Sequence, residues 1–357
     1  MRLLVLTTSD AWTPSTRLVL ALGAELAARG DVVAVACPTH PEFEAVVHRA
    51  FPRLYVRSLP RSGRVAQVLS ARRIVSALRP DAVLVHGEGD ALLAAVATGG
   101  RGAVVRRWRV DEHAPHATPV PRTWRTMLAA ACTRLTAWGL DPMAVSWPGP
   151  DPRQEDAVPI PTVPMALWIV PPGDHDEHTA LALRAAARLY RRHPSLRIVL
   201  LGDVAALQST RVHAAALGLT ACVQVASLDT LLGDDDLNAA AVWVTAAGDT
   251  GAIATLAAMQ RRVPVVVPAR SSCATMVAAG TTGFVVTDAD GSVIAAELAR
   301  LFADWAVFRA MGDAAQARAA DLYGWSPFVG GAAEFLLRAS GTPRPTSTVR
   351  PVRTRAS

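Results

Sequence analysis

Residues 241–268, AVWVTAAGDTGAIATLAAMQRRVPVVVP, contain the clearest structural pattern in the sequence. An apolar run at 241–245 is followed by a small polar loop at 246–251, an Ala-rich segment at 252–260 and a second apolar run at 263–268. Short apolar runs separated by a segment of helix length are typical of two parallel strands joined by a crossover helix. The stretch therefore predicts a buried β-α-β unit.

The same alternation extends in both directions from this unit. Further apolar runs of strand length lie at 3–6, 32–37, 82–85, 103–105, 165–170, 196–201 and 222–225. The chain has 357 residues, more than the roughly 250–300 that a single core accommodates. Between 148 and 164 the sequence PGPDPRQEDAVPIPTVP is rich in proline, which indicates a hinge. The predicted fold class is α/β, with two doubly wound domains.

The charged residues exclude several classes of enzyme. All 36 basic residues are arginine, and the absence of lysine excludes a Schiff-base enzyme, a P-loop and a kinase. An anionic ligand must therefore be held by arginine, by backbone N–H groups or by a metal. The formal net charge is +6, and four of the arginines lie in the Pro-, Ser- and Thr-rich segment 341–357. No zinc-finger, RNP or basic-helix pattern is present, so we expect no nucleic-acid partner.

The remaining composition indicates a cytoplasmic protein without a metal. The four cysteines are well separated in the sequence and form no C-x-x-C motif, so we expect them to be reduced and mostly buried thiols. The first apolar run is too short for a signal-peptide core, and the longest apolar passages are too short or too rich in proline to span a bilayer. The pairs His113-x-x-His116 and His175-x-x-His178 lack the further ligands that zinc needs, so we expect no metal site.

Six stretches form an ordered series along the chain. In the first half they are TPSTRLVLALGAELAARGDVVAVA (13–36) and LRPDAVLVHGEGDALLAA (78–95). In the second half they are RHPSLRIVLLGD (192–203), GDTGAIATLAAMQRRVPVVVPA (248–269), VAAGTTGFVV (277–286) and YGWSPFVGGAAEFLL (323–337). In this order and spacing they resemble GT-B glycosyltransferases, most closely those of family 4, over nearly the whole chain.

The resemblance implies a GT-B fold, in which two Rossmann-like domains face a central cleft. It implies an acceptor-side domain at 1–160, a donor-side domain at 161–324 and a last helix at 325–340 that crosses back to the first domain. Residues 341–357 have little to bury and are expected to form a disordered basic tail.

The activity that the resemblance implies is that of a bacterial hexosyltransferase of polysaccharide biosynthesis. Such an enzyme moves a sugar from a nucleotide-sugar donor to a glycan, lipid or small-molecule acceptor. It retains the configuration of the sugar and needs neither a metal nor a cofactor, because the nucleotide sugar is itself a substrate.

The donor-site motif departs from the family pattern. The Arg and Lys that usually hold the donor diphosphate are replaced by Pro172 and Glu177. Two Glu residues eight apart usually flank the leaving group and the ribose, and here Asp249 and Ala257 stand in their places. An Asp still accepts a hydrogen bond from a hydroxyl, with a shorter reach, whereas an Ala does not.

The next loop departs as well. A Gly-Gly pair is replaced by Ser271-Ser272, and the Glu that usually follows it by Thr275. The motif is thus degenerate, which leaves an alternative open: a catalytically inactive GT-B-like protein that binds a ligand or a partner enzyme.

One set of candidate donor-binding residues precedes the predicted helix at 252–260. Gly248-Asp249-Thr250-Gly251 stand where the backbone N–H groups and the dipole of that helix favour a diphosphate. By the resemblance, Asp249 is a catalytic-site residue that binds sugar or ribose hydroxyls, and Thr250 and Gly251 present N–H groups to the phosphates. A tight turn capped by Asp or Thr is the alternative interpretation.

Two further positions are expected to contact the donor. Gly202 and Asp203 follow a predicted strand and would border the nucleobase, although an ordinary turn explains them equally well. Arg270 would supply positive charge to the departing diphosphate in place of the missing Arg–Lys pair.

Candidate acceptor-side residues lie in the first half. Ser15-Thr16-Arg17 begin a predicted helix, where the planar guanidinium of Arg17 suits a phosphate or carboxylate. A Thr16 cap beside a solvated Arg17 is the alternative.

Three further candidates follow the later strands of the first half. His86 is the candidate catalytic group that polarises an acceptor hydroxyl and Glu88 would orient it, while a His that satisfies local backbone groups is the alternative. The family often carries a catalytic His after a later strand, and here His113 lies five residues beyond that position.

Residues 122–133 include Arg122, Trp124, Arg125 and Leu128. Such a helix suits an anionic membrane surface, so one expectation is peripheral contact with the cytoplasmic face of the inner membrane. A helix with one core side and one solvent side is the alternative interpretation.

Overall fold

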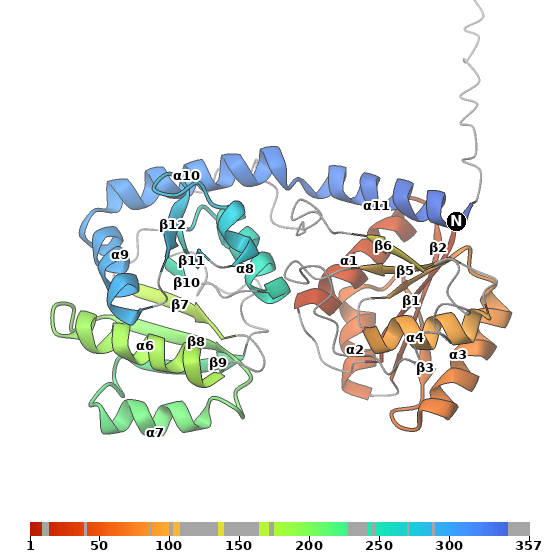
Figure 1. The fold of residues 1–357 in the computed structure, drawn as a ribbon, viewed down its shortest axis with the longest axis horizontal. Coiled ribbons are helices and arrows are strands. Elements are labelled where there is room, and N and C mark those ends of the chain that lie inside the picture. Colours follow the sequence, from red (N-terminus) through yellow and green to blue (C-terminus); the bar gives the residue numbers. More distant parts are fainter. Residues whose placement is uncertain are drawn as a thin grey trace, which may run out of the picture.

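The computed structural model describes residues 1–8, 14–38, 41–85, 88–99, 103–107, 135–138, 164–170, 175–227, 242–244, 248–269, 271–287 and 290–341. Figure 1 shows them as two α/β domains that are bridged along one side by the last two helices.

The first domain is built on a six-stranded sheet in which all neighbouring strands are parallel. Its strands are β1 (Arg2–Leu6), β2 (Val32–Pro38), β3 (Tyr55–Leu59), β4 (Ala82–Val85), β5 (Ala103–Arg107) and β6 (Leu135–Trp138). Central strands such as RLLVL and AVLV are apolar runs, which suits a parallel sheet buried on both faces. The strand order is β3-β2-β1-β4-β5-β6. Successive strands are added on one side of β1 up to β3 and on its other side from β4 onward, so the strand order reverses between β1 and β4.

Helices cover both faces of this sheet. Helices α1 (Pro14–Ala28) and α2 (Pro41–Ala50) pack on one face, and α3 (Arg64–Leu78) and α4 (Glu88–Thr98) on the other. The alternation of side chains along β1 supplies both cores, because Leu3 and Val5 join the cluster beneath α1 while Leu4 and Leu6 join the cluster beneath α4.

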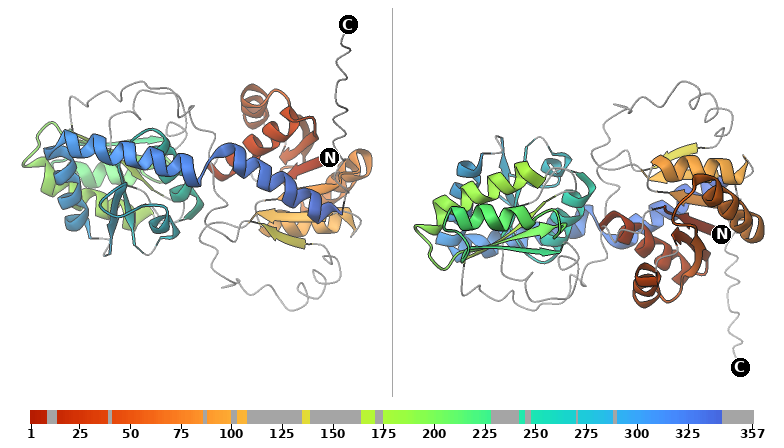
Figure 2. Two further views of the ribbon diagram at one scale, coloured as in Figure 1. Left: turned by 90° about the horizontal axis from the view of Figure 1, so that it is seen from above. Right: turned by 90° about the horizontal axis from the view of Figure 1, so that it is seen from below.

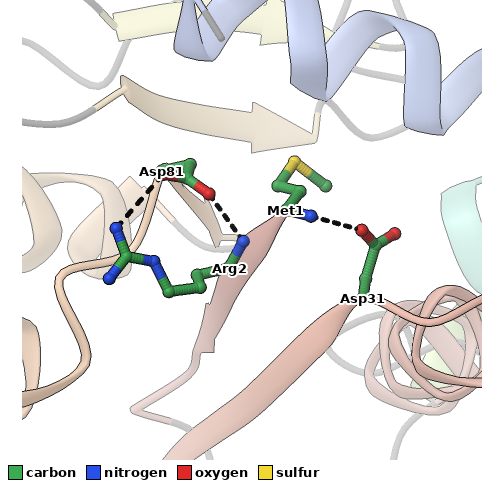
Figure 3. A network of polar contacts seen from close by, with 4 residues as sticks. All are labelled: Met1, Arg2, Asp31 and Asp81. Carbon is green, nitrogen blue, oxygen red and sulfur yellow. Dashed lines mark hydrogen bonds and ion pairs between the residues drawn. The ribbon is translucent and has the colours of Figure 1, made fainter. Parts of the chain in front are cut away.

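Polar contacts fix the amino-terminal ends of the first strands (Figure 3). The amino group of Met1 lies 2.7 Å from Oδ1 of Asp31, which immediately precedes β2. The backbone N–H of Arg2 donates to Oδ2 of Asp81 at 2.7 Å, and the Arg2 guanidinium lies 3.6 Å from the same carboxylate. Asp81 precedes β4, so these contacts hold β1, β2 and β4 in register at the edge opposite the carboxyl ends of the strands.

The second domain repeats the plan with a second parallel six-stranded sheet. Its strands are β7 (Met165–Ile169), β8 (Arg197–Gly202), β9 (Val223–Ser227), β10 (Val242–Val244), β11 (Val265–Pro268) and β12 (Gly283–Val286). The order is β12-β11-β10-β7-β8-β9, so the reversal lies between β7 and β10.

The helices of the second domain divide between the two faces of its sheet. Helices α6 (His175–Tyr190) and α9 (Gly291–Ala303) bury their apolar sides in one cluster, and α8 (Gly248–Gln260) lies in the other with the short 3-10 turn η4 (Ser272–Thr275). Helix α7 (Gln208–Ala216) lies between β8 and β9 in the sequence.

The last two helices join the domains. Helix α10 (Trp305–Leu322) packs against α8 and α9, whereas Val329, Ala332 and Leu336 of α11 (Trp325–Ser340) belong to the core of the first domain. Seen from above, the two helices follow one another across both domains (Figure 2). The extended backbone of Gly324 separates them.

The domains also meet directly. Leu18 of α1 is fully buried, and it belongs to the apolar cluster around α8 rather than to the cores of its own domain. The stacked rings of Trp325 and Phe328, 5.4 Å apart, border both this cluster and the core of the first domain. The start of α1 and the helix α8 are therefore held together by apolar packing.

The predicted α/β fold with two doubly wound domains is confirmed, and the structure differs in two added elements, α2 and β3, and at the ends of others. Residues 248–251, predicted as a loop, form the first turn of α8, and Glu88 to Asp90 form the first turn of α4. Gly and acidic residues read as turn signals in a sequence, but acids are favourable in the first turn of a helix. The proposed hinge up to residue 163, the segment 122–133 and residues 342–357 lie outside the described ranges.

Candidate functional site

The candidate site lies where the carboxyl ends of the strands of both sheets meet the starts of helices. In doubly wound sheets, ligands bind at the point where the strand order reverses. In the first domain α1 follows β1 and α4 follows β4, on either side of the reversal; in the second domain α8 follows β10, beside β7. Since α1 and α8 are in contact, the packing brings the two reversal points together.

Helix α8 presents its amino-terminal end to this site. Gly248 and Asp249 are its first residues, Thr250 is partly exposed and Gly251 is buried. From Ala252 to Met259 every residue is fully buried, so the axis of the helix is fixed by packing on all sides. Its first backbone N–H groups have no partner within the helix and carry about half a positive charge between them. This end of α8 can therefore accept an anionic group without rearrangement.

Gly202 and Asp203 at the end of β8 have local structural roles. A Cβ on Gly202 would lie 3.1 Å from the carbonyl oxygen of Val170 and 3.1 Å from a methyl group of Leu207, so this position favours glycine. Oδ1 of Asp203 accepts hydrogen bonds from the N–H groups of Ala205 at 2.9 Å and Ala206 at 3.4 Å. These hydrogen bonds form a turn after β8, and the side chain of Asp203 is exposed.

The turn η4 forms the next wall of the site, after β11. Oγ of Ser271 accepts a hydrogen bond from the N–H of Cys273 at 3.0 Å and thereby caps the turn. Arg318 of α10 holds the other end, where its Nε donates to the carbonyl of Met276 at 2.7 Å and its Nη2 to that of Thr275 at 3.2 Å. Arg318 is not predicted from the sequence, because it lies more than 40 residues beyond the turn that it holds.

On the first-domain side, Thr16 is buried and Arg17 partly buried in the first turn of α1, in which Ser15 also lies. Glu88 is the first residue of α4, while His86, His113 and Arg270 lie outside the described residues. Leu18, the residue after Arg17, packs in the apolar cluster that contains α8, so the first turn of α1 lies beside the second domain.

Asp90 is a further polar residue at this edge that the sequence did not single out. Its side chain is buried, and Oδ1 accepts hydrogen bonds from the backbone N–H of Thr8 at 2.9 Å and from the Thr8 hydroxyl at 2.5 Å. These bonds join the end of β1 to the first turn of α4, so Asp90 fixes the backbone on both sides of the reversal point. An acidic residue shortly after the apolar run at 82–85 is the sequence signal for this role.

Two observations on the described part of the chain concern other kinds of site. Within it, no group of three or more His, Cys, Asp or Glu side chains is arranged to hold a metal ion. None of the helices in the described ranges combines the length and apolar character that a membrane crossing requires.

A comparison with known families matches the second half of the chain. Residues 169–318 match the model of the family described as "Glycosyl transferases group 1". The matched region includes α8 and η4 as well as strands β8 to β12. No curated protein is similar enough in sequence to count as a relative.

Solved structures are similar over almost the whole chain. HepE of Anabaena in complex with UDP and glucose has a TM-score of 0.71 at 16% identity, covering 95% of this chain and 100% of that one. A glycosyltransferase from Rickettsia africae has a TM-score of 0.70 at 10% identity, covering 96% and 99%. UDP-GlcNAc 2-epimerase from Neisseria meningitidis bound to UDP-GlcNAc has a TM-score of 0.62 at 14% identity, covering 95% and 100%. These similarities show the fold, and they confirm the predicted GT-B arrangement of two Rossmann-like domains.

Proposed function

We propose that this chain transfers a sugar from a nucleotide-sugar donor, held by the second domain, to an acceptor held by the first. The observation that carries the proposal is the match of residues 169–318 to the group 1 glycosyl transferases, because that region contains the whole α8–η4 side of the candidate site. The complexes of HepE with UDP and UDP-glucose support a uridine nucleotide as the carrier of the sugar.

The first turn of α8 is the proposed diphosphate site. Charge builds on the departing diphosphate during transfer, and fixed N–H dipoles stabilise such charge because they need no reorganisation. Glu177, where the family carries a Lys, is exposed in the first turn of α6 and supplies no positive charge. The N–H groups of α8, with Arg270 and Arg17 as the candidate cations, therefore take over the role of the usual Arg–Lys pair.

Recognition of the donor sugar is expected to rest on fewer carboxylates than in the family pattern. Ala257 is fully buried within α8, so no side chain there reaches a hydroxyl. Asp249, in the first turn of the same helix, is the acid proposed to accept from a ribose or sugar hydroxyl. The proposal includes retention of configuration, independence from metal ions, His86 as the group that polarises the acceptor, and a glycan or lipid as the acceptor.

Calorimetric titration of the full chain with UDP, UDP-glucose, UDP-GlcNAc and GDP-mannose tests the donor site. We expect at least one nucleotide sugar to bind with a Kd below about 1 mM. Thr250→Asp adds a carboxylate to the first turn of α8, which is compatible with the helix dipole but repels a diphosphate, so binding should weaken by about tenfold or more. Val307→Asp is the matched control, because Val307 is 43% exposed at the third residue of α10, as Thr250 is the third of α8.

Other outcomes would replace the proposal. The absence of binding at millimolar nucleotide sugar would favour the inactive, ligand- or partner-binding alternative. Conversion of UDP-GlcNAc into its 2-epimer without an acceptor would show an epimerase on this fold. Equal loss of binding in the Thr250→Asp and Val307→Asp proteins would remove the start of α8 from the donor site.

A further inference from the structure

The segment from the end of α2 to the end of α3, which includes the edge strand β3, concentrates positive charge. Between residues 45 and 80 the sequence has eight arginines and no acidic residue, whereas the whole chain carries a net charge of only +6. All eight side chains are exposed: Arg49, Arg53, Arg57, Arg61, Arg64, Arg72, Arg73 and Arg79. The excess of positive charge outside residues 341–357 is therefore concentrated in this segment.

The outer face of α3 combines this charge with exposed aliphatic side chains. Val65 is 74% exposed and Leu69 is 54% exposed, although both are large and apolar. Val65, Leu69 and Arg72 are spaced by four and three residues, so they share one face of the helix, and Arg73 borders it. Gln67 and Ala71 on the opposite face are buried against the sheet.

A groove continues this surface towards the edge of the sheet. It encloses about 480 Å³ between α3 and the strands β2 and β3, and its lining includes Tyr55, Arg57, Arg73 and Ile74. Tyr55 is 61% exposed, and β3 is the edge strand of the sheet. The lining is mainly apolar and includes two arginines, Arg57 and Arg73.

We propose that the outer face of α3 and this groove dock the protein on an anionic phospholipid surface. Arginines near such a surface gain favourable energy from its negative potential. A soluble polyanion would use the arginines but would leave Val65 and Leu69 in water, whereas the boundary between headgroups and acyl chains accommodates both kinds of side chain. An aromatic ring such as Tyr55, apolar with one polar end, also suits that boundary.

The proposed docking surface extends along α3 from one edge of the sheet to the other. Helix α3 begins shortly after the carboxyl end of β3, so its first turn, with Arg64 and Val65, lies at the same edge as the starts of α1 and α4. The groove lies at the opposite edge, because Val32 and Tyr55 are the first residues of β2 and β3, so docking would lay the length of α3 along the lipid surface.

Co-sedimentation of the full chain with vesicles tests the charged part of the proposal. We expect binding to phosphatidylcholine vesicles that contain about 30 mol% phosphatidylglycerol, little binding to pure phosphatidylcholine, and weaker binding as salt rises. Arg72→Gln with Arg73→Gln should weaken binding by about 10- to 30-fold. The control pair is Arg191→Gln with Arg192→Gln, two adjacent exposed arginines after α6 in the other domain, which should leave binding unchanged.

The aliphatic side chains separate a membrane from a soluble polyanion. Val65→Gln with Leu69→Gln should weaken vesicle binding by about fivefold or more, because these side chains lose their apolar contact. The matched control is Val212→Gln with Leu217→Gln, which replaces residues 69% and 59% exposed at α7 in the second domain.

Two results would overturn the proposal. If both arginine pairs weaken vesicle binding equally, net charge rather than this surface is responsible. If Val65→Gln with Leu69→Gln binds vesicles like the unaltered protein, and a short DNA duplex binds through Arg72 and Arg73 as tightly as vesicles do, the surface is a polyanion site. All the substituted side chains are exposed, so unchanged thermal unfolding shows that each variant is folded, and no step of the test requires sugar transfer.

Discussion

Gly312 of α10 lies directly against the backbone of Arg262, so that a Cβ on Gly312 would stand 2.0 Å from the carbonyl oxygen of Arg262. Arg262 ends the turn after α8 in a left-handed conformation, with φ of 58°, and its Nε donates to Gln316 at 2.8 Å. The close approach fixes the carboxyl end of α8, whose other end faces the candidate site.

Gly312→Ala is therefore expected to destabilise the protein by about 3 kcal/mol, because the obstructing atom is backbone and both helices must shift. Urea unfolding measures the change. Gly330→Ala is the control, since nothing lies within 4 Å of a Cβ there, and it should raise stability by about 0.5–1 kcal/mol as Ala replaces Gly in a helix. A Gly312→Ala protein as stable as the unaltered one would show that α10 can move away from α8 at no cost.

Arg318 is expected to act as a positioning residue for the donor site. Arg318→Ala removes two hydrogen bonds to η4 and should cost about 1–2 kcal/mol of stability, while donor affinity falls several-fold because the turn loosens. Arg309→Ala, at an exposed position of the same helix, should change neither quantity. Unfolding and donor titration of the two variants give the comparison, and a loss of stability without a loss of affinity would confine Arg318 to a structural role.

The buried thiols predict a loss of stability at alkaline pH. Burial, with a smaller contribution from nearby Glu44, raises the pKa of Cys37 to about 12, and burial raises the pKa of Cys222 to about 11. In the unfolded chain a thiol loses its proton near pH 8.5, so above that pH the folded state binds more protons than the unfolded state. Stability is complete below about pH 8.5 and should fall by up to about 1.4 kcal/mol per pH unit and thiol above it.

Urea midpoints between pH 8 and pH 10 check this dependence. Cys37→Ala should show a shallower fall than the unaltered protein, because one of the two thiols is removed. An identical slope in both proteins would mean that Cys37 ionises equally in the folded and unfolded states.

Asp249→Asn separates a donor contact from a structural role. If the carboxylate accepts a hydrogen bond from a donor hydroxyl, the Asp249→Asn variant should lose about 10- to 100-fold in donor affinity or turnover. Its stability should change by no more than about 1 kcal/mol, the usual effect of an acid in the first turn of a helix. Asp290→Asn, which alters the cap of α9, is the control and should leave activity unchanged. Full activity in the Asp249→Asn protein would leave only the backbone of α8 in the donor site.

The central strands could be predicted because they are apolar runs buried on both faces. Helix α2 and strand β3 were not predicted, for different reasons. Three residues of β3 are exposed, and Tyr55 and Arg57 give it no alternation of apolar and polar side chains. Helix α2 has only Phe43 and Val47 fully buried among its described side chains, too few for a clear period.

The sequence predicts where the candidate site lies along the chain, but not the long-range contacts that hold its residues in place. Gly202 and Asp203 are recognisable as a turn after a strand, yet the contact of Gly202 with Val170 depends on how β8 lies beside β7. Likewise, Arg318 and Asp90 form hydrogen bonds with residues that are far away in the sequence, and no local sequence pattern predicts such contacts.

The position of α11 has a consequence for how the chain is made. Val329, Ala332 and Leu336 complete the core of the first domain, although they are synthesised after the whole of the second. Domains usually fold as units in the order in which they leave the ribosome. Here the core of the domain that emerges first is completed only when the final helix has been made, and until then the apolar surface that α11 covers is exposed.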